Sequence, residues 1–468
     1  MAEPSPEVLA QLRELLGEKG VREQSDDYLP NVILKPSSTD EVAAILRVCS
    51  AAGQALVPLG GKTGLASGHF QTDGELGLSL ERMQAIEEID TENRTMTVQA
   101  GCILQNAAEA AEEQDLLLPL DFGARGSATI GGNVATNAGG NMVIRYGMTR
   151  DMVLGLEVVL ADGTVVCNLN KMIKNNTGYD IRQWFIGAEG TLGVITRVVL
   201  RLRPQPKSQN TALLAVDDFP AVAQLLRFLD SRTAGTLSAF EVMWPEFYEY
   251  ITREGSTHQR PLPHGCAHYV LVETQGADPV SDSERFEAVL AEAMAEGLVS
   301  DAVLTRSQAE RNALWEIRDD VLELFTQGPF IPFDVSLTIE RMQAFIADIR
   351  AAMAAYEDAI CVVFGHLGDG NLHVNLGNRN AENFDYDALQ TLLYETVERY
   401  HGSVSAEHGI GLSKREQLPR SRSPEELQLM MGLKRMLDPQ NILNPNKIFS
   451  AAQIAAASHY SPATETPV

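Results

Sequence analysis

The chain has 468 residues, of which 44% are hydrophobic, and this length is too great for one ordinary core, so we expect two or three domains. Its 37 basic and 63 acidic side chains give a net charge of −26, which would repel nucleic acid, and no apolar run approaches the roughly 20 residues of a transmembrane segment. Five cysteines without a Cys-x-x-Cys pair argue against a disulfide framework, an iron–sulfur cluster and a cysteine zinc site.

The region up to Pro204 and Pro206 combines short strands, glycine turns and a few helices. Its first residues are acidic and lack the pattern of a signal peptide, so we expect a cytoplasmic protein. Apolar spacing predicts helices at residues 5–20, 38–48 and 103–114. Short apolar runs predict strands at residues 29–36, 54–59, 156–160, 164–167 and 194–202. The two prolines mark a domain boundary.

Beyond residue 210, strands alternate with long amphipathic helices, which is typical of a sheet covered by helices. The predicted strands include residues 270–273 and 334–337. The predicted helices are at residues 281–296, 308–326, 340–355, 383–400 and 424–437. The last residues, 458–468, are small and polar, and we expect them to be disordered.

Three glycine-rich segments occur at residues 60–64, 123–147 and 187–193. The first is not a phosphate loop, because that motif needs a glycine five positions before Gly61 and Leu56 stands there. In the second, small residues leave backbone N–H groups free, which suits a diphosphate and a polar ring edge. The alternative is a set of tight turns in a β-rich domain.

A hairpin is predicted at residues 359–376, where a strand, a Leu-Gly-Asp-Gly turn and an alternating strand follow one another. Its four-residue turn sets His366 opposite Asn371, so both project from one side together with His373 and Asn375. The apolar residues of the second strand face a core on the other side; they are Leu372, Val374 and Leu376. Two imidazoles on one polar face suit a metal ion. The alternative is that they form hydrogen bonds inside a buried hairpin.

Several of these motifs resemble those of a known superfamily. Residues 58–64, 129–133, 145–147 and 187–193 look like the FAD-binding domain of the vanillyl-alcohol oxidase/PCMH superfamily. The hairpin, with residues 405–411 and 444–448, is similar to the C-terminal part of D-2-hydroxyglutarate and D-lactate dehydrogenases. The resemblance covers about residues 25 to 450, and the motifs occur in the order of the family.

The resemblance implies an α+β protein in which a two-subdomain PCMH-type domain binds FAD and a cap domain covers the isoalloxazine. We expect the FAD-binding domain at residues 25–206, an α+β substrate domain with a metal site at 207–410, and a C-terminal helical segment that returns to the FAD domain at 411–457. Covalent members of the family carry a histidine near the first glycine loop, where this chain has Lys62, so we expect noncovalent FAD.

The residues that match the family's cofactor-binding motifs come from all three glycine segments and from the C-terminus. They are Pro58, Gly60, Gly61, Lys62, Thr63, Gly64, Ser67, Gly68, Thr129, Gly131, Gly132, Asn133, Thr136, Asn137, Gly139, Gly140, Arg145, Tyr146, Gly147, Glu189, Gly190, Gly193, Ile195 and Asn444.

By the resemblance, the metal ligands are His366, His373 and Glu407, and the metal is usually zinc. Two histidines and one carboxylate leave open coordination positions, as in catalytic sites. Manganese, iron and cobalt also suit these ligands, so the sequence leaves the metal open. His408, next to a ligand, is the expected general base and contacts substrate, and Asn375 is expected to bind substrate through a hydrogen bond.

Arg318 matches the family arginine that binds a substrate carboxylate. Without the resemblance, we would interpret this arginine as a member of a surface ion pair. The hydroxyglutarate enzymes tend to have Thr and Lys where this chain has Leu322 and Pro332, so we favour a monocarboxylate such as D-lactate, with 2-hydroxyglutarate next. Trp244 and Tyr248 either touch substrate or pack in the core, and core packing is favoured.

The sequence therefore predicts an FAD- and metal-dependent dehydrogenase that converts a D-2-hydroxy acid to its 2-oxo acid. Electrons would leave to an electron-transfer flavoprotein or a quinone, and a homodimer is an open possibility. The alternatives are a flavin oxidase that uses oxygen and a non-catalytic flavin-binding subunit of a glycolate-oxidase-like complex. The substrate, the metal, the acceptor and the oligomeric state are not decided by the sequence.

Overall fold

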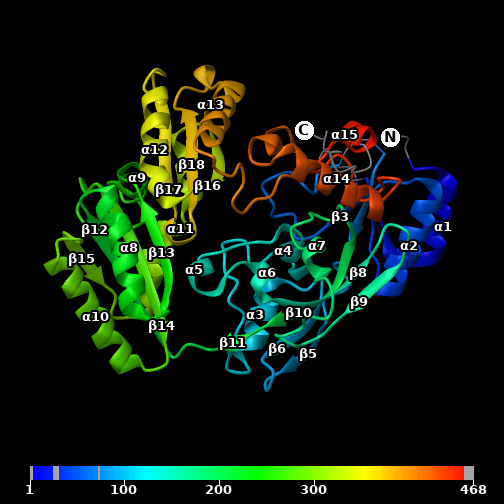
Figure 1. Cartoon of the computed structure of the whole chain (residues 1–468), viewed down its shortest axis with the longest axis horizontal. Helices are drawn as coiled ribbons and strands as arrows, with labels where there is room; N and C mark the ends of the chain where they lie inside the picture. The colour runs from blue at the N-terminus through cyan, green and yellow to red at the C-terminus, as the bar shows by residue number, and fades with distance from the viewer. Residues whose placement is uncertain (1–3, 25–30, 72–73, 458–468) are drawn as a thin grey trace, which may run out of the picture. The chain divides into compact units, whose positions relative to one another are not determined.

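The computed structural model describes residues 4–24, 31–71 and 74–457, and its internal contacts divide the chain into two units (Figure 1). Unit 1 contains Met1–Gly139, Met148–Gln205 and Glu407–Val468, and unit 2 contains Gly140–Gly147 and Pro206–Ala406. The tail at 458–468, for which we expect disorder, lies outside the described residues. Within those ranges, no helix has the length and apolar character that a membrane crossing requires.

Unit 1 begins with two helices, α1 (Pro6–Leu16) and α2 (Thr39–Ala52), that share a core with a small mixed sheet. The side chain of Ser38 accepts a hydrogen bond from Glu41 N and so starts α2, and Gly53 ends it with a left-handed backbone. In the described chain the sheet has the order β1-β2-β4-β3. Its strands, with a short 3₁₀ helix η1 (Glu18–Gly20) before them, are β1 (Val21–Glu23), β2 (Val32–Leu34), β3 (Leu56–Leu59) and β4 (Leu76–Ser79).

A second, antiparallel sheet of unit 1 has the order β5-β6-β10-β8-β9 among the described residues. Its strands are β5 (Ile86–Asp90), β6 (Thr95–Gln99), β8 (Val153–Val159), β9 (Val165–Asn168) and β10 (Val194–Arg201). The strands β7 (Leu116–Leu117) and β11 (Arg203–Pro204) pair separately. The helices of this region are α3 (Leu104–Glu112), α4 (Ile130–Thr136), α6 (Thr149–Met152) and α7 (Arg182–Phe185).

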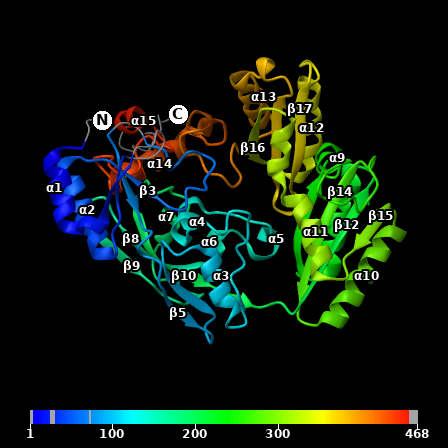
Figure 2. The ribbon, with the colours of Figure 1, turned by 180° about the vertical axis from the view of Figure 1, so that it is seen from behind.

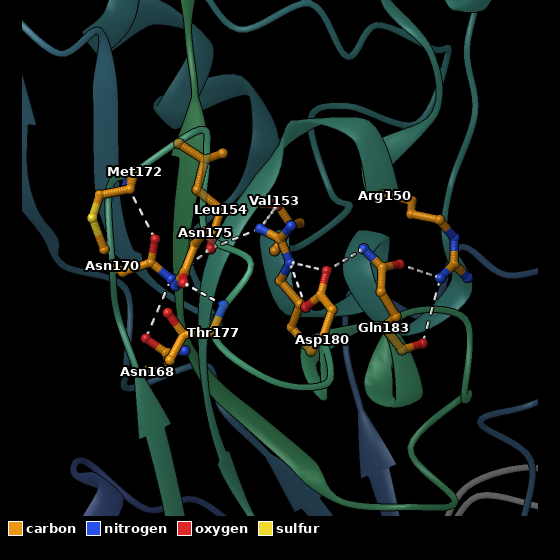
Figure 3. Close-up of polar contacts among 11 residues, drawn as sticks. Arg150, Val153, Leu154, Asn168, Asn170, Met172, Asn175, Thr177, Asp180 and Gln183 are labelled. Atoms are coloured by element: carbon orange, nitrogen blue, oxygen red, sulfur yellow. Dashed lines mark hydrogen bonds and ion pairs between the residues drawn. The ribbon is translucent and has the colours of Figure 1, made fainter.

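Two arginines hold the chain between β9 and β10 (Figure 3). Arg182 Nη1 donates to the first two carbonyl oxygens of β8 at 2.7 and 2.8 Å, and Arg150 Nη1 donates to Gln183 Oε1 at 2.5 Å. Arg150 Nη2 also donates to the carbonyl oxygen of Ile186 at 2.9 Å. Because Gly187 follows directly, Arg150 fixes the point at which the third glycine segment begins.

The C-terminal helical segment returns to unit 1, as predicted. It contains η5 (Arg415–Arg420), α14 (Pro424–Leu437) and α15 (Ala451–Ala456). The buried ammonium group of Lys434 donates to Asp438 Oδ2 at 2.6 Å and to the carbonyl oxygens of Thr191 and Leu443 at 2.8 and 2.7 Å. Leu443 in turn forms a bridge with Leu56 of β3. One cation therefore joins α14, the third glycine segment and the edge of the first sheet.

Unit 2 is built on an antiparallel sheet with the order β15-β12-β14-β13-β17-β18-β16 in the part of the chain that the structure describes. The strands are β12 (Ser208–Val216), β13 (Leu237–Met243), β14 (His268–Gly276), β15 (Asp301–Leu304), β16 (Phe330–Ser336), β17 (Ala359–His366) and β18 (Asn371–Asn378). The helices are α5 (Val143–Tyr146), α8 (Phe219–Thr233), α9 (Pro245–Ile251), α10 (Pro279–Ala295), α11 (Gln308–Asp319), α12 (Ile339–Met353) and α13 (Tyr386–Arg399). Figure 2 shows α12 and α13 side by side along the β16–β18 part of the sheet.

Helices α9 and α11 cover one face of this sheet, which we call the α11 face. Leu314 and Ile317 of α11 share a core with Leu271 of β14, Met243 of β13 and Phe364 of β17. Because side chains alternate along a strand, residues two positions away from these strand residues point to the same face. The residues of β18 that were predicted to face a core on the other side of the hairpin are at most 1% exposed; they are Leu372, Val374 and Leu376.

The single helix predicted at residues 308–326 is wrong in part. Helix α11 ends at Asp319, and a 3₁₀ helix, η2 (Val321–Gln327), follows it. Asp320 leaves the helical conformation with ψ 56°, and its side chain accepts a hydrogen bond from Glu323 N. A short acidic side chain that caps a new turn competes with helix continuation, and apolar spacing alone does not show this competition. The combination of two α+β subdomains and an α+β cap is confirmed.

Replacing Lys434 by methionine is expected to lower the free energy of unfolding by about 3–5 kcal/mol, because Asp438 would remain buried without its cation. Chemical denaturation of the FAD-loaded protein measures the change. The matched control is Arg125→Met, which removes the exposed ion pair with Asp121 and should cost about 1 kcal/mol or less. Equal losses for the two variants would contradict the assigned role of Lys434.

Candidate active site

Unit 1 contains a cavity of about 280 Å³ that is lined mainly by the glycine segments. The end of β3 and the loop after it contribute residues 58–64, and the start of α4 contributes Thr129, Gly131 and Gly132. Glu189 of the third segment also lines the cavity. A concave site of this size, surrounded by small residues and backbone groups, is typical of a cofactor or ligand site.

Glycine is required where the loops around the cavity meet. A Cβ atom at Gly61 would lie 2.0 Å from the carbonyl oxygen of Ser127. A Cβ atom at Gly131 would lie 2.6 Å from Cβ of Ala100. Both distances are far shorter than van der Waals contact, so any other residue would push the loops apart. The glycines therefore let backbones pack together and leave backbone groups along the cavity.

Several non-glycine residues in the segments around the cavity have a left-handed backbone. They include Lys62, Ser67, Glu189 and Asn444, with φ angles of 60°, 58°, 51° and 44°. This conformation costs about 1 kcal/mol or more for such residues and persists only where the surroundings impose it. Strained backbone of this kind gathers at functional sites, which supports the cavity as the cofactor site.

Two buried amide atoms in the lining lack a protein partner. Asn133 Nδ2 and Asn444 Oδ1 have no hydrogen-bond partner among the described residues. The other amide atom of Asn444 donates to the carbonyl oxygen of Glu189 at 2.7 Å. An unsatisfied buried polar atom costs about 1–3 kcal/mol, so a bound group with polar edges is the natural partner. A flavin ring offers both donors and acceptors, and the lining therefore fits the expected FAD.

Most of the predicted cofactor-binding residues line this cavity. These are Pro58, Gly60, Gly61, Lys62, Thr63, Gly64, Gly68, Thr129, Gly131, Gly132, Asn133, Thr136, Glu189, Gly190, Gly193, Ile195 and Asn444. Of the described residues, the remaining predicted ones are outside its lining: Ser67, Asn137, Gly139, Gly140, Arg145, Tyr146 and Gly147.

Arg145 and Tyr146 have their contacts in unit 2. Arg145 Nη1 donates to the carbonyl oxygen of Gln275 at 2.7 Å, and the hydroxyl group of Tyr146 donates to Gln275 Oε1 at 3.0 Å. The sequence placed both residues in the FAD-binding domain, whereas the contacts assign Gly140–Gly147 to unit 2. Their role as flavin ligands stays a prediction.

Sequence reasoning missed part of the cavity lining. The missed residues include Ser79, Leu80, Glu81, Gln84, Ala100, Gly101 and Ile103. The sequence feature that could have indicated them is Gly101, a lone glycine after a strand, where a Cβ atom would lie 1.9 Å from the carbonyl oxygen of Leu80.

Glu189 binds the segment that follows His408 within unit 1. Its Oε1 accepts a hydrogen bond from Ile410 N at 2.7 Å, and its Oε2 accepts one from Gly411 N at 2.8 Å. Burial raises the pKa of Glu189, and the two N–H groups oppose this shift. His408 itself lines the cavity. The third glycine segment therefore fixes the chain beside the expected general base.

The predicted hairpin is present in unit 2 as β17 and β18. Phe364 pairs with His373, so His366 lies opposite Asn371, as predicted. The ring centroids of His366 and His373 are 5.4 Å apart. Since Phe364 belongs to the core of the α11 face, His366 and His373 also point to that face.

A buried carboxylate that sequence analysis did not single out binds two of the predicted site residues. Glu241 Oε2 accepts from Arg318 Nε, and Glu241 Oε1 lies against His366 Nδ1, both at 2.8 Å. Arg318 Nη2 is 3.2 Å from His366 Nε2. The exposed fractions are 1% for Glu241, 4% for Arg318 and 6% for His366, so Arg318 forms a buried ion pair and not a surface one.

Burial by itself raises the pKa of Glu241, but its interactions with His366 and Arg318 outweigh burial and lower the pKa. Glu241 is therefore ionised. Its two oxygens hold one guanidinium group and one imidazole ring, which fixes the orientation of both.

Two of the three predicted metal ligands, His366 and His373, lie on the adjacent strands β17 and β18 of unit 2. The third, Glu407, follows Ala406 directly in the chain. Two nitrogens and one carboxylate oxygen form the donor set of open zinc sites, which keep a position for water or substrate. The donor set therefore fits a divalent cation.

Asp334 pairs with His373 across β16 and β18, and sequence analysis did not single it out. Asp334 Oδ2 accepts a hydrogen bond from Ala406 N at 3.1 Å. The residue that precedes Glu407 is therefore fixed to the sheet beside His373.

Three other predicted residues are buried. Asn375 is 1% exposed, and its Nδ2 donates to the carbonyl oxygen of Val362 at 3.2 Å, so the structure shows a contact within the hairpin. Trp244 is 3% exposed and Tyr248 is fully buried, with its hydroxyl group bonded to the backbone of Leu262. Core packing is therefore confirmed for these two aromatic residues.

Two protein-family models together match most of the chain. Residues 30–167 match the family described as FAD binding domain, and residues 205–448 match the family described as FAD linked oxidases, C-terminal domain. The chain belongs to the FAD-linked oxidases. The resemblance predicted from the motifs is confirmed, and this FAD-linked oxidase is an FAD-dependent oxidoreductase.

Relatives named D-2-hydroxyglutarate dehydrogenase align with this FAD-linked oxidase over most of its length. The protein of Xanthomonas citri pv. viticola is 42% identical, with 90% of this chain and 89% of the relative covered. The mitochondrial protein of Bos taurus is 41% identical, with 89% and 76% covered. The protein of Stutzerimonas stutzeri is 38% identical, with 90% and 91% covered.

Solved structures show the same fold at low sequence identity. Alkyldihydroxyacetonephosphate synthase has a TM-score of 0.73 at 17% identity, with 95% of this chain and 85% of that chain covered. The 4-ethylphenol oxidase from Gulosibacter chungangensis has a TM-score of 0.74 at 18% identity, with 96% and 100% covered. At these identities the likeness concerns the fold of the FAD-linked oxidase and not its substrate.

Replacing Asn133 by alanine is expected to weaken FAD binding by about 5- to 100-fold, because a buried hydrogen bond to the cofactor would be lost. Alanine suits the helical backbone of α4, so the fold should persist. Titration of the apoprotein with FAD, followed by flavin fluorescence, gives the affinity. The control is Asn210→Ala, which removes another amide with an unpartnered Nδ2, outside the cavity lining. Unchanged affinity in Asn133→Ala would contradict the FAD assignment.

Proposed function

We propose that this FAD-linked oxidase oxidises a D-2-hydroxy acid to the 2-oxo acid, with noncovalent FAD as hydride acceptor and a divalent metal ion, zinc first, at His366, His373 and Glu407. The observation that carries the proposal lies within unit 2, where the rings of His366 and His373 are neighbours on one face of the hairpin and His366 contacts the buried Arg318. The relatives named D-2-hydroxyglutarate dehydrogenase support the same class of substrate.

Arg318 is the residue for the substrate carboxylate in this proposal. Glu241 occupies its Nε, so the Nη groups are the donors for the two carboxylate oxygens. Nη2 lies 3.2 Å from His366 Nε2, which places a bound carboxylate next to a metal ligand. The arginine therefore orients the substrate with its hydroxyl-bearing carbon beside the same group of ligands.

His408 takes the proton of the substrate hydroxyl group. It lines the cavity of unit 1, where the flavin is expected to bind, and an imidazole is a common general base near neutral pH. A bound divalent cation supplies Lewis acidity that lowers the pKa of the substrate hydroxyl group. The flavin supplies the acceptor for the hydride from C2.

The choice between two D-2-hydroxy acids depends on two positions that carry no charge. Leu322 is 77% exposed, and Pro332 pairs with Asn375 at the edge of the sheet. Neither side chain binds a second carboxylate, which favours D-lactate. The names of the relatives favour D-2-hydroxyglutarate, so both acids are compared below.

The proposed acceptor of the electrons is an electron-transfer flavoprotein or a quinone, and the proposed compartment is the cytoplasm. The rival functions are a flavin oxidase and a non-catalytic flavin-binding subunit. The rivals differ in how the flavin responds to substrate and to air.

Under anaerobic conditions, D-lactate or D-2-hydroxyglutarate is expected to bleach the visible band of the oxidised flavin, and the L-enantiomers are expected to leave it unchanged. The bleached flavin of a dehydrogenase should reoxidise slowly on mixing with air and rapidly with an added quinone. Stopped-flow absorbance measures both steps. Fast reoxidation by air would favour the oxidase, and no bleaching by any 2-hydroxy acid would favour the non-catalytic subunit.

His373→Ala is expected to remove bound metal and to lower kcat/KM about 1,000-fold, since Lewis-acid stabilisation is worth several kcal/mol. FAD content should be unchanged, because His373 is outside the lining of the described cavity. Metal analysis and steady-state kinetics test both effects. The control is His264→Ala, which removes a histidine of unit 2 that binds Thr252. An active, metal-free His373→Ala enzyme would refute the ligand assignment.

A further inference from the structure

Glu241 lies on β13, far in sequence from every residue of the predicted site, yet it contacts two of them. Its carboxylate is 1% exposed and is shared between the Arg318 guanidinium group and the His366 ring, each at 2.8 Å. Both partners come from other elements, α11 and β17. A buried carboxylate in this position acts on the site through its neighbours.

The contacts of His366 fix which ring nitrogen carries the proton. Nδ1 lies against Glu241 Oε1, an acceptor, so Nδ1 carries hydrogen. Nε2 lies 3.2 Å from Arg318 Nη2, a donor, so Nε2 presents its lone pair, and a metal ion bound at Nε2 would take the place of this contact. Metal binding uses a neutral imidazole through its unprotonated nitrogen, and a carboxylate on the other nitrogen holds that tautomer.

An amide could not replace this carboxylate. If the oxygen of a glutamine at position 241 accepted from His366 Nδ1, its NH₂ group would face Arg318 Nε, and two donors would meet. If the glutamine turned over, its NH₂ group would face His366 Nδ1 and favour the tautomer with hydrogen on Nε2. One of the two partners would always lose its orientation.

We propose that Glu241 is a positioning residue that orients His366 for a metal ion and Arg318 for the substrate carboxylate at the same time. The proposal rests on the proposed function, because it assumes that His366 is a metal ligand. It predicts that the metal affinity and the substrate affinity of the enzyme both depend on this one carboxylate.

The sheet offers a matched control for Glu241. Glu273 on β14 is also 1% exposed and also accepts from an arginine of α11, with Arg311 Nε at 2.7 Å. Its further partners are Trp315 Nε1 and Thr211 Oγ1, at 3.0 and 2.9 Å. Glu241 and Glu273 therefore share burial, charge and helix partner, but the described contacts of Glu273 include no histidine.

The experiment uses FAD-loaded protein whose metal has been removed with a chelator, and titrates Zn²⁺ in competition with a chromogenic chelator. Glu241→Gln is expected to weaken Zn²⁺ binding by about 10- to 100-fold and to raise KM for the 2-hydroxy acid, with FAD content unchanged. Glu273→Gln is expected to keep the wild-type Zn²⁺ affinity. A structural loss alone would affect both variants alike.

Glu241→Gln leaves the buried guanidinium group of Arg318 without an anion, so this variant is expected to be less stable than the wild-type protein. The pair Arg318→Met and Arg318→Met/Glu241→Gln compares the two side chains at position 241 with no cation at 318, and in Arg318→Met the carboxylate keeps its contact with His366 Nδ1. The double variant is expected to bind Zn²⁺ about 10- to 100-fold more weakly than Arg318→Met.

Equal Zn²⁺ affinity in the single variant Arg318→Met and in the double variant would overturn the role of Glu241 and leave the proposed function intact. Failure of wild-type protein to bind Zn²⁺ would overturn the metal site of the proposed function, and the role of Glu241 at His366 with it.

Discussion

A carboxylate buried in a sheet is unfavourable unless a cation pairs with it, and two carboxylates on the α11 face of unit 2, Glu241 and Glu273, pair with arginines of α11. Glu241 and Glu273 bind Arg318 and Arg311, which are seven residues apart on α11 and so share one side of the helix. The helix is therefore attached to the sheet at two points. Any rotation of α11 would break a buried ion pair, and this constraint holds Arg318 against His366.

A different constraint organises unit 1, where loops with little side-chain bulk pack backbone against backbone. Gly61 and Gly131 allow this contact, and it brings backbone groups to the cavity without side chains in the way. Because such loops have few apolar contacts of their own, they depend on polar groups around them. Lys434 and Arg150 supply these groups by binding carbonyl oxygens within and just before the third glycine segment.

The sequence predicts local features of the site well and distant ones poorly. Alternation along the hairpin was enough to put His366 and His373 on one face, since a strand has a period of two. Glu241 and Asp334 were not found, because they reach the histidines only through the strand order β13-β17-β18-β16. A single sequence shows which segments form strands, but the order and register of distant strands depend on packing. The same limit applies to the placement of Arg145, which the sequence put in the FAD-binding domain and which the contacts assign to unit 2, where it binds Gln275.

The short segment that carries Glu407 and His408 combines both kinds of constraint. In unit 2, Asp334 accepts a hydrogen bond from Ala406 N, directly before Glu407. In unit 1, Glu189 accepts hydrogen bonds from Ile410 N and Gly411 N, directly after His408 and Gly409. A ligand and a base on a free loop would sample many conformations, and their ordering would have to accompany substrate binding. With a carboxylate on each side, the backbone of these two residues is ordered in advance, which is the condition for the proposed metal ligand and the proposed proton acceptor to act on one hydroxyl group.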